Sequence, residues 1–262
     1  MQIKAADILK RHYEKNLAAV KLDEKEMVKR KYRHSYEVLK VGRDLYIKLG
    51  LPKKEHDLCD AALLLHDLGR FYQIKDGQWD FTKDHGDLGG LALKEEGLAD
   101  IPELFGPVVM HNKPDGIDRL HKDEQFQKLS KAHQERIFLF LKIVMDADMV
   151  ANLIAQSKKG PPKDHFAGLV DPSSTQKVLN DFNENKQILN KDIKTRSDCW
   201  IFIFAWRANL SFEESKRRIK ENGAYKRLLM QMKDDMVRHN ATEKDLMILS
   251  HIEEEMIKSN LI

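Results

Sequence analysis

The sequence has little cysteine, no long apolar run and little excess charge of either sign. Only two cysteines occur, Cys59 and Cys199, and they form no Cys-x-x-Cys pair. This argues against a disulfide framework and a thiolate zinc site, and it is typical of a reducing compartment. The longest apolar run, Cys199–Trp206, is far shorter than the ~20 residues that a helix needs to cross a bilayer.

Charged residues are abundant but nearly balanced. The 45 Lys and Arg stand against 42 Asp and Glu, which leaves a net charge of +3. So small an excess does not favour nucleic acid binding. Residues 1–7 lack the apolar segment of a signal peptide. We therefore expect a cytoplasmic protein that binds neither nucleic acid nor a membrane; no feature indicates an oligomeric state.

The spacing of apolar residues predicts helices, and no alternating pattern is long enough to build a sheet. A long helix is predicted over about residues 23–49, ending at Gly50 because glycine suits the C-terminal cap. A second covers about residues 55–67, and a third, over about 131–156, follows two shorter ones. Of the two shorter helices, one is expected to begin after a cap at Thr82 or Asp84 and the other at Ile101–Pro102. A small hairpin is expected at Asp76–Gly77. Three or four C-terminal helices are expected, with breaks at Asn222–Gly223 and His239–Asn240.

These elements predict an all-α fold in two parts. Residues 1–156 form a first helical domain, and Ser157–Asp164 is predicted to be a loop or linker because it combines glycine with two prolines. Residues 157–262 then form a C-terminal helical extension packed on that domain. The first part also contains the histidines and aspartates that are considered next as a possible site, all of them before residue 150: His34, His66, Asp67, His85, His111 and Asp148.

The run Leu63–Gly69 places a histidine and a carboxylate side by side at the end of an apolar helical segment. Burying a polar group without a partner costs about 2–7 kcal/mol, and more for a charge. A bound cation offsets that cost. Adjacent helical residues project about 100° apart, so His66 and Asp67 can both reach one ion. His34 lies seven residues after Met27, on the inward face of the first long helix.

The helix over residues 131–156 offers two carboxylates, which the spacing separates. Asp148 follows Leu141 by seven residues and Val144 by four, so it points inward. Asp146 follows Lys142 by four, and we expect it to form a solvent-facing pair worth a few tenths of a kcal/mol, or to support the ligands. Asp148 is therefore the predicted ligand.

Together these residues give a mixed nitrogen and oxygen ligand set: His34, His66, Asp67 and Asp148. Such a set suits a divalent transition metal such as Fe, Mn, Co, Ni or Zn. His85 and His111 supply two more imidazoles, enough to hold a second ion bridged through Asp67. Two ions about 3.5–4 Å apart hold a phosphate and generate a hydroxide nucleophile. Alternatively, His85 is a polar residue of a first helical turn, and His111 interacts with a helix C-terminus.

At these residues the sequence resembles the HD-domain superfamily of metal-dependent phosphohydrolases. The resemblance covers roughly residues 20–155 and rests on three stretches: Arg33-His34-Ser35, Leu64–Arg70 and Asp146-Ala147-Asp148. It implies an HD-domain-like helical bundle, here with additional C-terminal helices, in which the four-residue ligand set binds one metal. Asp84–Gly89 resembles the helix start of the branch with two metals, and His111 its next histidine. Asn112 stands where several relatives carry a second histidine, and Arg70 where lysine is common.

The resemblance implies an enzyme that hydrolyses a phosphate ester, such as that of a nucleotide, with a metal-activated water. Asp67 would orient this water as a general base while binding metal. Cationic donors pair well with phosphate oxygens. The candidates for binding the phosphorylated substrate are therefore Lys113, Arg70 and Arg33, although the 45 basic residues make a nearby lysine or arginine expected by chance.

Two other functions are compatible with the same residues. The first is a di-iron oxygenase on the same scaffold, which would contain iron and consume oxygen. The second is a non-catalytic module that binds a nucleotide and changes the state of a partner, which would bind its ligand without turnover. Fold-level similarity does not by itself fix the chemistry.

Overall fold

The computed structural model describes residues 3–75, 78–80, 82–113, 115–161, 166, 168–169 and 173–262. The regular elements of the described residues are helices, apart from one short antiparallel ladder, so the predicted all-α fold is confirmed. The chain divides into two compact units, Met1–Asp148 and Met149–Ile262. The boundary between them falls inside a long helix. That the C-terminal unit packs on the first stays a prediction.

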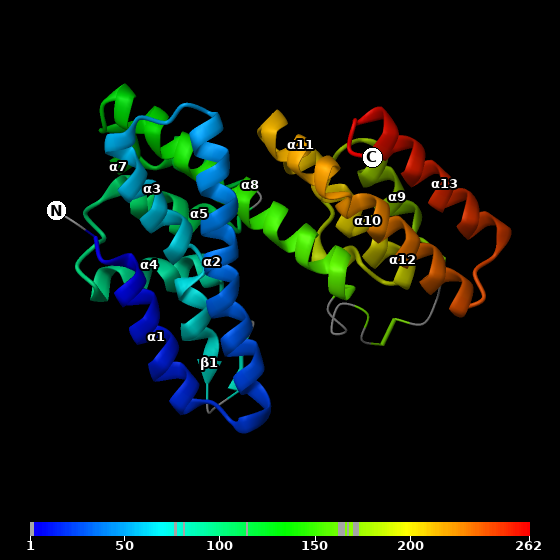
Figure 1. Cartoon of the computed structure of the whole chain (residues 1–262), viewed down its shortest axis with the longest axis horizontal. Helices are drawn as coiled ribbons and strands as arrows, with labels where there is room; N and C mark the ends of the chain where they lie inside the picture. Colours follow the sequence, from blue (N-terminus) through cyan, green and yellow to red (C-terminus); the bar gives the residue numbers. More distant parts are fainter. Residues whose placement is uncertain are drawn as a thin grey trace. The chain divides into compact units, whose positions relative to one another are not determined.

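The N-terminal unit is built from α-helices, two 3-10 helices and the ladder (Figure 1). In chain order these are α1 Ala5–Ala19, η1 Leu22–Glu24, α2 Lys25–Lys48, α3 Lys53–Leu65, η2 Leu68–Gln73, β1 Ile74–Lys75, β2 Gln78–Trp79, α4 His85–Glu95, α5 Pro102–Met110, α6 Gly116–Lys122, α7 Glu124–Gln127 and the first part of α8 Lys131–Lys159.

Several predicted boundaries are confirmed by their local hydrogen bonds. After α2, Gly50 adopts a φ of 73°, and the N–H groups of Gly50 and Leu51 donate to Ile47 O at 3.1 Å and Tyr46 O at 3.0 Å. This pair of bonds satisfies carbonyls that the helix end leaves open. Asp84 caps α4, because its carboxylate accepts from the backbone N–H of Asp87 at 2.9 Å.

Other boundaries differ from the prediction. Helix α3 ends at Leu65, so His66 is its cap and Asp67 lies beyond it. Helix α8 continues to Lys159 and includes the start of the predicted loop. The ladder pairs Ile74 with Trp79, as a hairpin requires, while the turn at Asp76–Gly77 and residues 162–164 of the loop lie outside the described residues.

Helix α3 lies at the centre of the N-terminal unit. It packs against α1, α2 and α5, which surround it in Figure 1. Its last turn, residues 61–65, is accordingly buried on every side. Segment η2 follows directly and packs on α4. The His66–Asp67 pair therefore leaves the central helix inside the unit, where both residues are at most 4% exposed.

The C-terminal unit contains more helices than the three or four predicted. Its elements after α8 are α9 Gln176–Asn183, η4 Asn190–Asp192, α10 Arg196–Ala205, η5 Trp206–Asn209, α11 Glu213–Asn222, α12 Ala224–Arg238 and α13 Glu243–Lys258. The predicted breaks are present, with φ of 68° at Gly223 and 55° at Asn240. The prediction was wrong because α9 and α10 are short and each is fixed by contacts outside its own sequence.

Among the described residues, none of the helices combines the length and apolarity needed to cross a bilayer. Cys59 and Cys199 are buried thiols and form no disulfide.

Candidate metal centre

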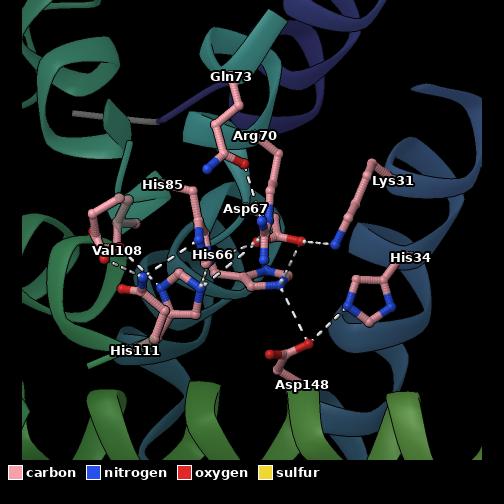
Figure 2. Close-up of polar contacts among 12 residues, drawn as sticks. Lys31, His34, His66, Asp67, Arg70, Gln73, His85, Val108, His111 and Asp148 are labelled. Carbon is pink, nitrogen blue, oxygen red and sulfur yellow. Dashed lines mark hydrogen bonds and ion pairs between the residues drawn. The ribbon is translucent and has the colours of Figure 1, made fainter. Parts of the chain in front are cut away.

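Five separate stretches of the N-terminal unit bring imidazoles and carboxylates to one place (Figure 2). They are His34 of α2, His66 and Asp67 after α3, His85 at the first residue of α4, His111 at the cap of α5, and Asp148 of α8. The structure therefore gathers all six predicted ligands. Their roles as ligands stay predictions.

One group of potential ligand atoms comprises His34, His66 and Asp148, all within 4.8 Å of one another. His34 Nε2 lies 2.7 Å from Asp148 Oδ1, and His66 Nε2 lies 3.7 Å from the same oxygen. The two histidines are buried, whereas the Asp148 side chain is 29% exposed. This group has the residue types and spacing to hold one ion.

A second group comprises His66, Asp67 and His111, so His66 belongs to both. Asp67 Oδ1 lies 3.7 Å from His111 Nε2 and 3.3 Å from His85 Nε2. Asp67 Oδ2 lies 3.9 Å from His66 Nε2. In Figure 2 these side chains point toward one another around Asp67. The two groups therefore form one continuous cluster.

His66 is oriented as a metal ligand requires. Its Nδ1 lies 2.8 Å from Leu63 O, and a carbonyl can only accept, so Nδ1 carries the proton. Its Nε2 is fully buried and has no hydrogen-bond partner among the described residues. An unsatisfied buried acceptor costs about 1–3 kcal/mol. A metal ion would use that lone pair, and a backbone carbonyl on the other nitrogen is the usual support for a ligating histidine.

Asp67 is ionised despite its burial. Burial raises its pKa, but nearby positive charge, above all that of Lys31, outweighs that effect and holds the pKa well below its usual range. The ammonium of Lys31 lies 3.0 Å from Asp67 Oδ2. The sequence interpretation missed Lys31, although a signal was present: it lies four residues after Met27 and three before His34, on the same helix face.

The pKa values of Asp148 and His85 are shifted as well. Burial raises the pKa of Asp148, but the hydrogen bond from His34 outweighs it, and the pKa lies well below its usual range. Burial lowers the pKa of His85 to about 2, against the opposing charge of Asp67. The carboxylate is therefore charged and the imidazole neutral at physiological pH.

Asp146 contradicts its predicted exposure. Its side chain is fully buried, so it does not face solvent. Ile143, one turn earlier on the same side of α8, is fully buried as well. The prediction failed because this stretch of α8 is covered on more than one face, which the spacing of a single apolar stripe does not reveal.

The predicted phosphate-binding cations lie in three different places. Arg70 Nε is 3.5 Å from Asp67 Oδ1, at the cluster. Lys113 is buried, and its ammonium lies 2.7 Å from Asp84 Oδ1 and 2.8 Å from Asp87 Oδ1. Arg33 is exposed on α2, and no contact with the cluster is present among the described residues. Of the three, Arg70 is the one positioned at the cluster.

Gly69 explains how His85 comes to lie beside Asp67. A Cβ at this position would overlap the backbone oxygen of His85 and the backbone nitrogen of Gly89. Only glycine lets η2 approach the first turns of α4 so closely. The glycine that follows the His-Asp pair therefore brings α4 to the cluster.

Comparison with known proteins identifies a domain over this region. Residues 32–153 match the HD domain family. The matched range begins two residues before His34 and ends five after Asp148, so it includes all six clustered residues. No curated protein and no solved structure matches the chain significantly.

Proposed function

We propose that this chain, whose residues 32–153 match the HD domain family, is a metal-dependent phosphohydrolase that cleaves a phosphate ester. The observation that carries the proposal is the buried Nε2 of His66, which faces Asp67 and Asp148 but has no hydrogen-bond partner among the described residues. A divalent transition metal fits these donors. The residues that would hold it are His34, His66, Asp67 and Asp148.

When bound, such a metal acts as a Lewis acid and lowers the pKa of a coordinated water. Asp67 contributes an ionised carboxylate whose two oxygens face different partners, His85 and Lys31. Because its pKa lies well below its usual range, Asp67 is a weak proton acceptor. Its expected part is to orient the attacking water by accepting a hydrogen bond.

Two cations, Lys31 and Arg70, flank Asp67, and we expect them to bind a phosphoryl group. The side chains of Lys31 and Arg70 are 19% and 22% exposed, so each reaches both the cluster and solvent. Cationic donors form strong hydrogen bonds with phosphate oxygens. We therefore assign the substrate to phosphate monoesters, nucleotides included. Lys113 is not placed for this role, because two carboxylates already hold its ammonium.

The test uses the full chain, purified without a histidine tag and loaded with each candidate metal in turn. Phosphate release is measured from a panel of nucleotides and other monoesters, with and without chelator. Asp67→Asn and His34→Gln should each abolish release and lower the metal content. His12→Gln is the matched control: His12 is 7% exposed against 6% for His34, but its Nε2 bonds Glu96 at 3.0 Å, outside the cluster.

Three outcomes would contradict the proposal in different ways. No release from any compound by metal-loaded protein would exclude the hydrolase. Nucleotide binding without turnover would favour the non-catalytic module. Iron together with oxygen consumption would favour the oxygenase.

A further inference from the structure

His85 differs from the other clustered histidines in the group that faces its Nδ1 atom. Nδ1 of His66 and of His111 face backbone carbonyls, Leu63 O at 2.8 Å and Val108 O at 2.9 Å. Both rings therefore carry their proton on Nδ1 and present a lone pair on Nε2. His34 donates from Nε2 to Asp148 Oδ1 at 2.7 Å, but its Nδ1 faces an acceptor, a Glu37 carboxylate oxygen 4.0 Å away, so its proton can move to Nδ1 when an ion binds.

His85 Nδ1 instead faces a donor. The side-chain amide nitrogen of Asn112 lies 3.3 Å from it. The same amide atom lies 2.7 Å from Asp84 Oδ2. Since an ionised carboxylate only accepts hydrogen bonds, this atom has to be the NH₂ nitrogen and not the amide oxygen. Each of its two hydrogens then has one acceptor, Asp84 Oδ2 and His85 Nδ1.

The amide is held in this orientation from several sides. Asp84 is fixed by Lys113 Nζ at 2.7 Å and by the N–H of Asp87 at 2.9 Å. Rotating the Asn112 amide by half a turn would place its oxygen against this carboxylate. Gly86 leaves the space that Asn112 occupies, because a Cβ there would overlap Asn112 Oδ1. The residues at the start of α4 therefore hold the Asn112 side-chain amide in one orientation.

A neutral imidazole has one N–H, so accepting at Nδ1 leaves the proton of His85 on Nε2. That nitrogen lies 3.3 Å from Asp67 Oδ1 and 3.2 Å from His111 Nε2, and both of these atoms are acceptors. Each contact then pairs a donor with an acceptor: the Asn112 amide donates to His85 Nδ1, and His85 Nε2 donates toward Asp67 and His111. A metal ligand, by contrast, needs a lone pair on the nitrogen that faces the ion.

We propose that Asn112 is a positioning residue that holds His85 in the Nε2–H tautomer, so that His85 donates a hydrogen bond toward Asp67 and does not bind metal. The centre accordingly holds a single tightly bound ion. The count of ions rests on the proposed function, whereas the tautomer does not. The two groups of potential ligand atoms described above are consistent with this proposal, since neither contains His85. This departs from the expectation that His85 helps to hold a second ion.

The tautomer is measured directly on the metal-free full chain labelled with ¹⁵N-histidine. Long-range ¹H–¹⁵N spectra distinguish protonated from unprotonated ring nitrogens, and His85→Gln identifies the His85 signals. We expect a protonated Nε2 for His85 and a protonated Nδ1 for His66 and His111. A protonated Nδ1 on His85 would overturn the proposal.

Asn112→Asp tests the cause, because it places an acceptor against His85 Nδ1. The His85 proton should move to Nδ1, and a second equivalent of metal should bind ~10–100-fold more tightly than in the wild type, the range of an outer-shell ligand partner. Asn112→Leu, which removes the donor without adding a charge, should give a mixture of tautomers. Asn183→Asp is the control, because Asn183 Oδ1 contacts His251 at 2.7 Å in the C-terminal unit.

Metal titration of the wild type completes the test. One tightly bound equivalent supports the proposal. Two equivalents, one of which is lost in His85→Gln, would overturn it. A chain that shows the Nε2–H signature but binds no metal would contradict the proposed function and still support the role of Asn112.

Discussion

The two units of this protein bury carboxylates in opposite ways. In the C-terminal unit, Asp198 is fully buried at the start of α10, where it accepts from the backbone N–H groups of Thr175 at 2.8 Å, Lys194 at 3.0 Å and Thr195 at 3.2 Å. In the N-terminal unit, Asp67 faces imidazoles, one of which has an unpaired nitrogen. A buried acid indicates a site only when its neighbours leave bonding capacity unused.

The capping role in the C-terminal unit is repeated. Asp245, 1% exposed, accepts from the N–H and hydroxyl of Thr242 at 2.8 Å and 2.7 Å at the start of α13. Such capping boxes satisfy donors that every helix start leaves open. Burial alone would therefore rank these structural aspartates together with the candidate ligands, and hydrogen-bond accounting separates them.

Removing His66 should give the largest functional effect. His66 belongs to both ligand groups, so His66→Ala should lose the bound metal and lower phosphate release by roughly 10³-fold or more, the scale of removing a central catalytic group. Metal content by mass spectrometry and initial rates check this. Unchanged metal content would break the comparison between the units.

Asp198→Ala should give the largest loss of stability with no loss of metal. Three backbone N–H groups lose their acceptor: those of Thr175 and Lys194 are partly buried, that of Thr195 is buried, and an unsatisfied buried group costs about 1–3 kcal/mol. We expect the unfolding free energy to fall by roughly 3 kcal/mol or more in chemical denaturation. Asp234→Ala, an exposed aspartate of α12, is the control and should change little. Loss of metal in Asp198→Ala would show that the capping acids also serve the site.

Gly69→Ala should lower both the stability of the fold and the affinity for metal by a moderate amount. The added methyl would overlap the backbone of α4, and overpacking costs about 1–3 kcal/mol. Because the strain falls between Asp67 and His85, metal affinity should drop as well, as isothermal titration would show. In Gly106→Ala the nearest atom is a side-chain methyl of Ile137 at 3.0 Å, which can adjust. Equal effects of the two substitutions would refute the close-approach argument.

Acidification should lower the stability of the C-terminal unit by protonating Asp235. We expect this effect to be smaller than those of the three substitutions above. Burial raises the pKa of Asp235, but hydrogen bonds from Arg196 and Trp200 outweigh it and lower the pKa below its usual value. A carboxyl group whose pKa is lower in the folded state stabilises the fold at pH values above its unfolded-state pKa of about 3.9. This stabilisation is lost as the pH falls through the folded-state pKa. Wild-type Tm should therefore drop below about pH 4.

In Asp235→Asn the Tm at pH 7 should be ~2–4 °C lower, and part of the acid-dependent drop should be absent. Thermal unfolding between pH 7 and pH 3 measures both. An unchanged acid dependence in the variant would remove Asp235 from the explanation.

Local sequence was sufficient for most of the helices and for the central motif. The cap at Asp84, the turn after α2 and the breaks at Gly223 and Asn240 each depend on bonds between residues close in sequence. The same locality explains the failure at Asp146. Its burial depends on what covers α8, and a solvent-facing spacing looks the same whether or not another segment lies there.

The sequence by itself determined that the protein is helical, where the helices turn, and that His66 and Asp67 leave an apolar helix together. Tertiary structure alone decided what those residues meet. Lys31 contacts Asp67 across 36 positions, Asn112 contacts His85 across 27, and Lys113 contacts Asp84 across 29. The physical reason is the range of the forces. Helix propensity and capping act within about one turn of chain, whereas the protonation and pairing of a buried group depend on whichever segments the fold brings within hydrogen-bond distance.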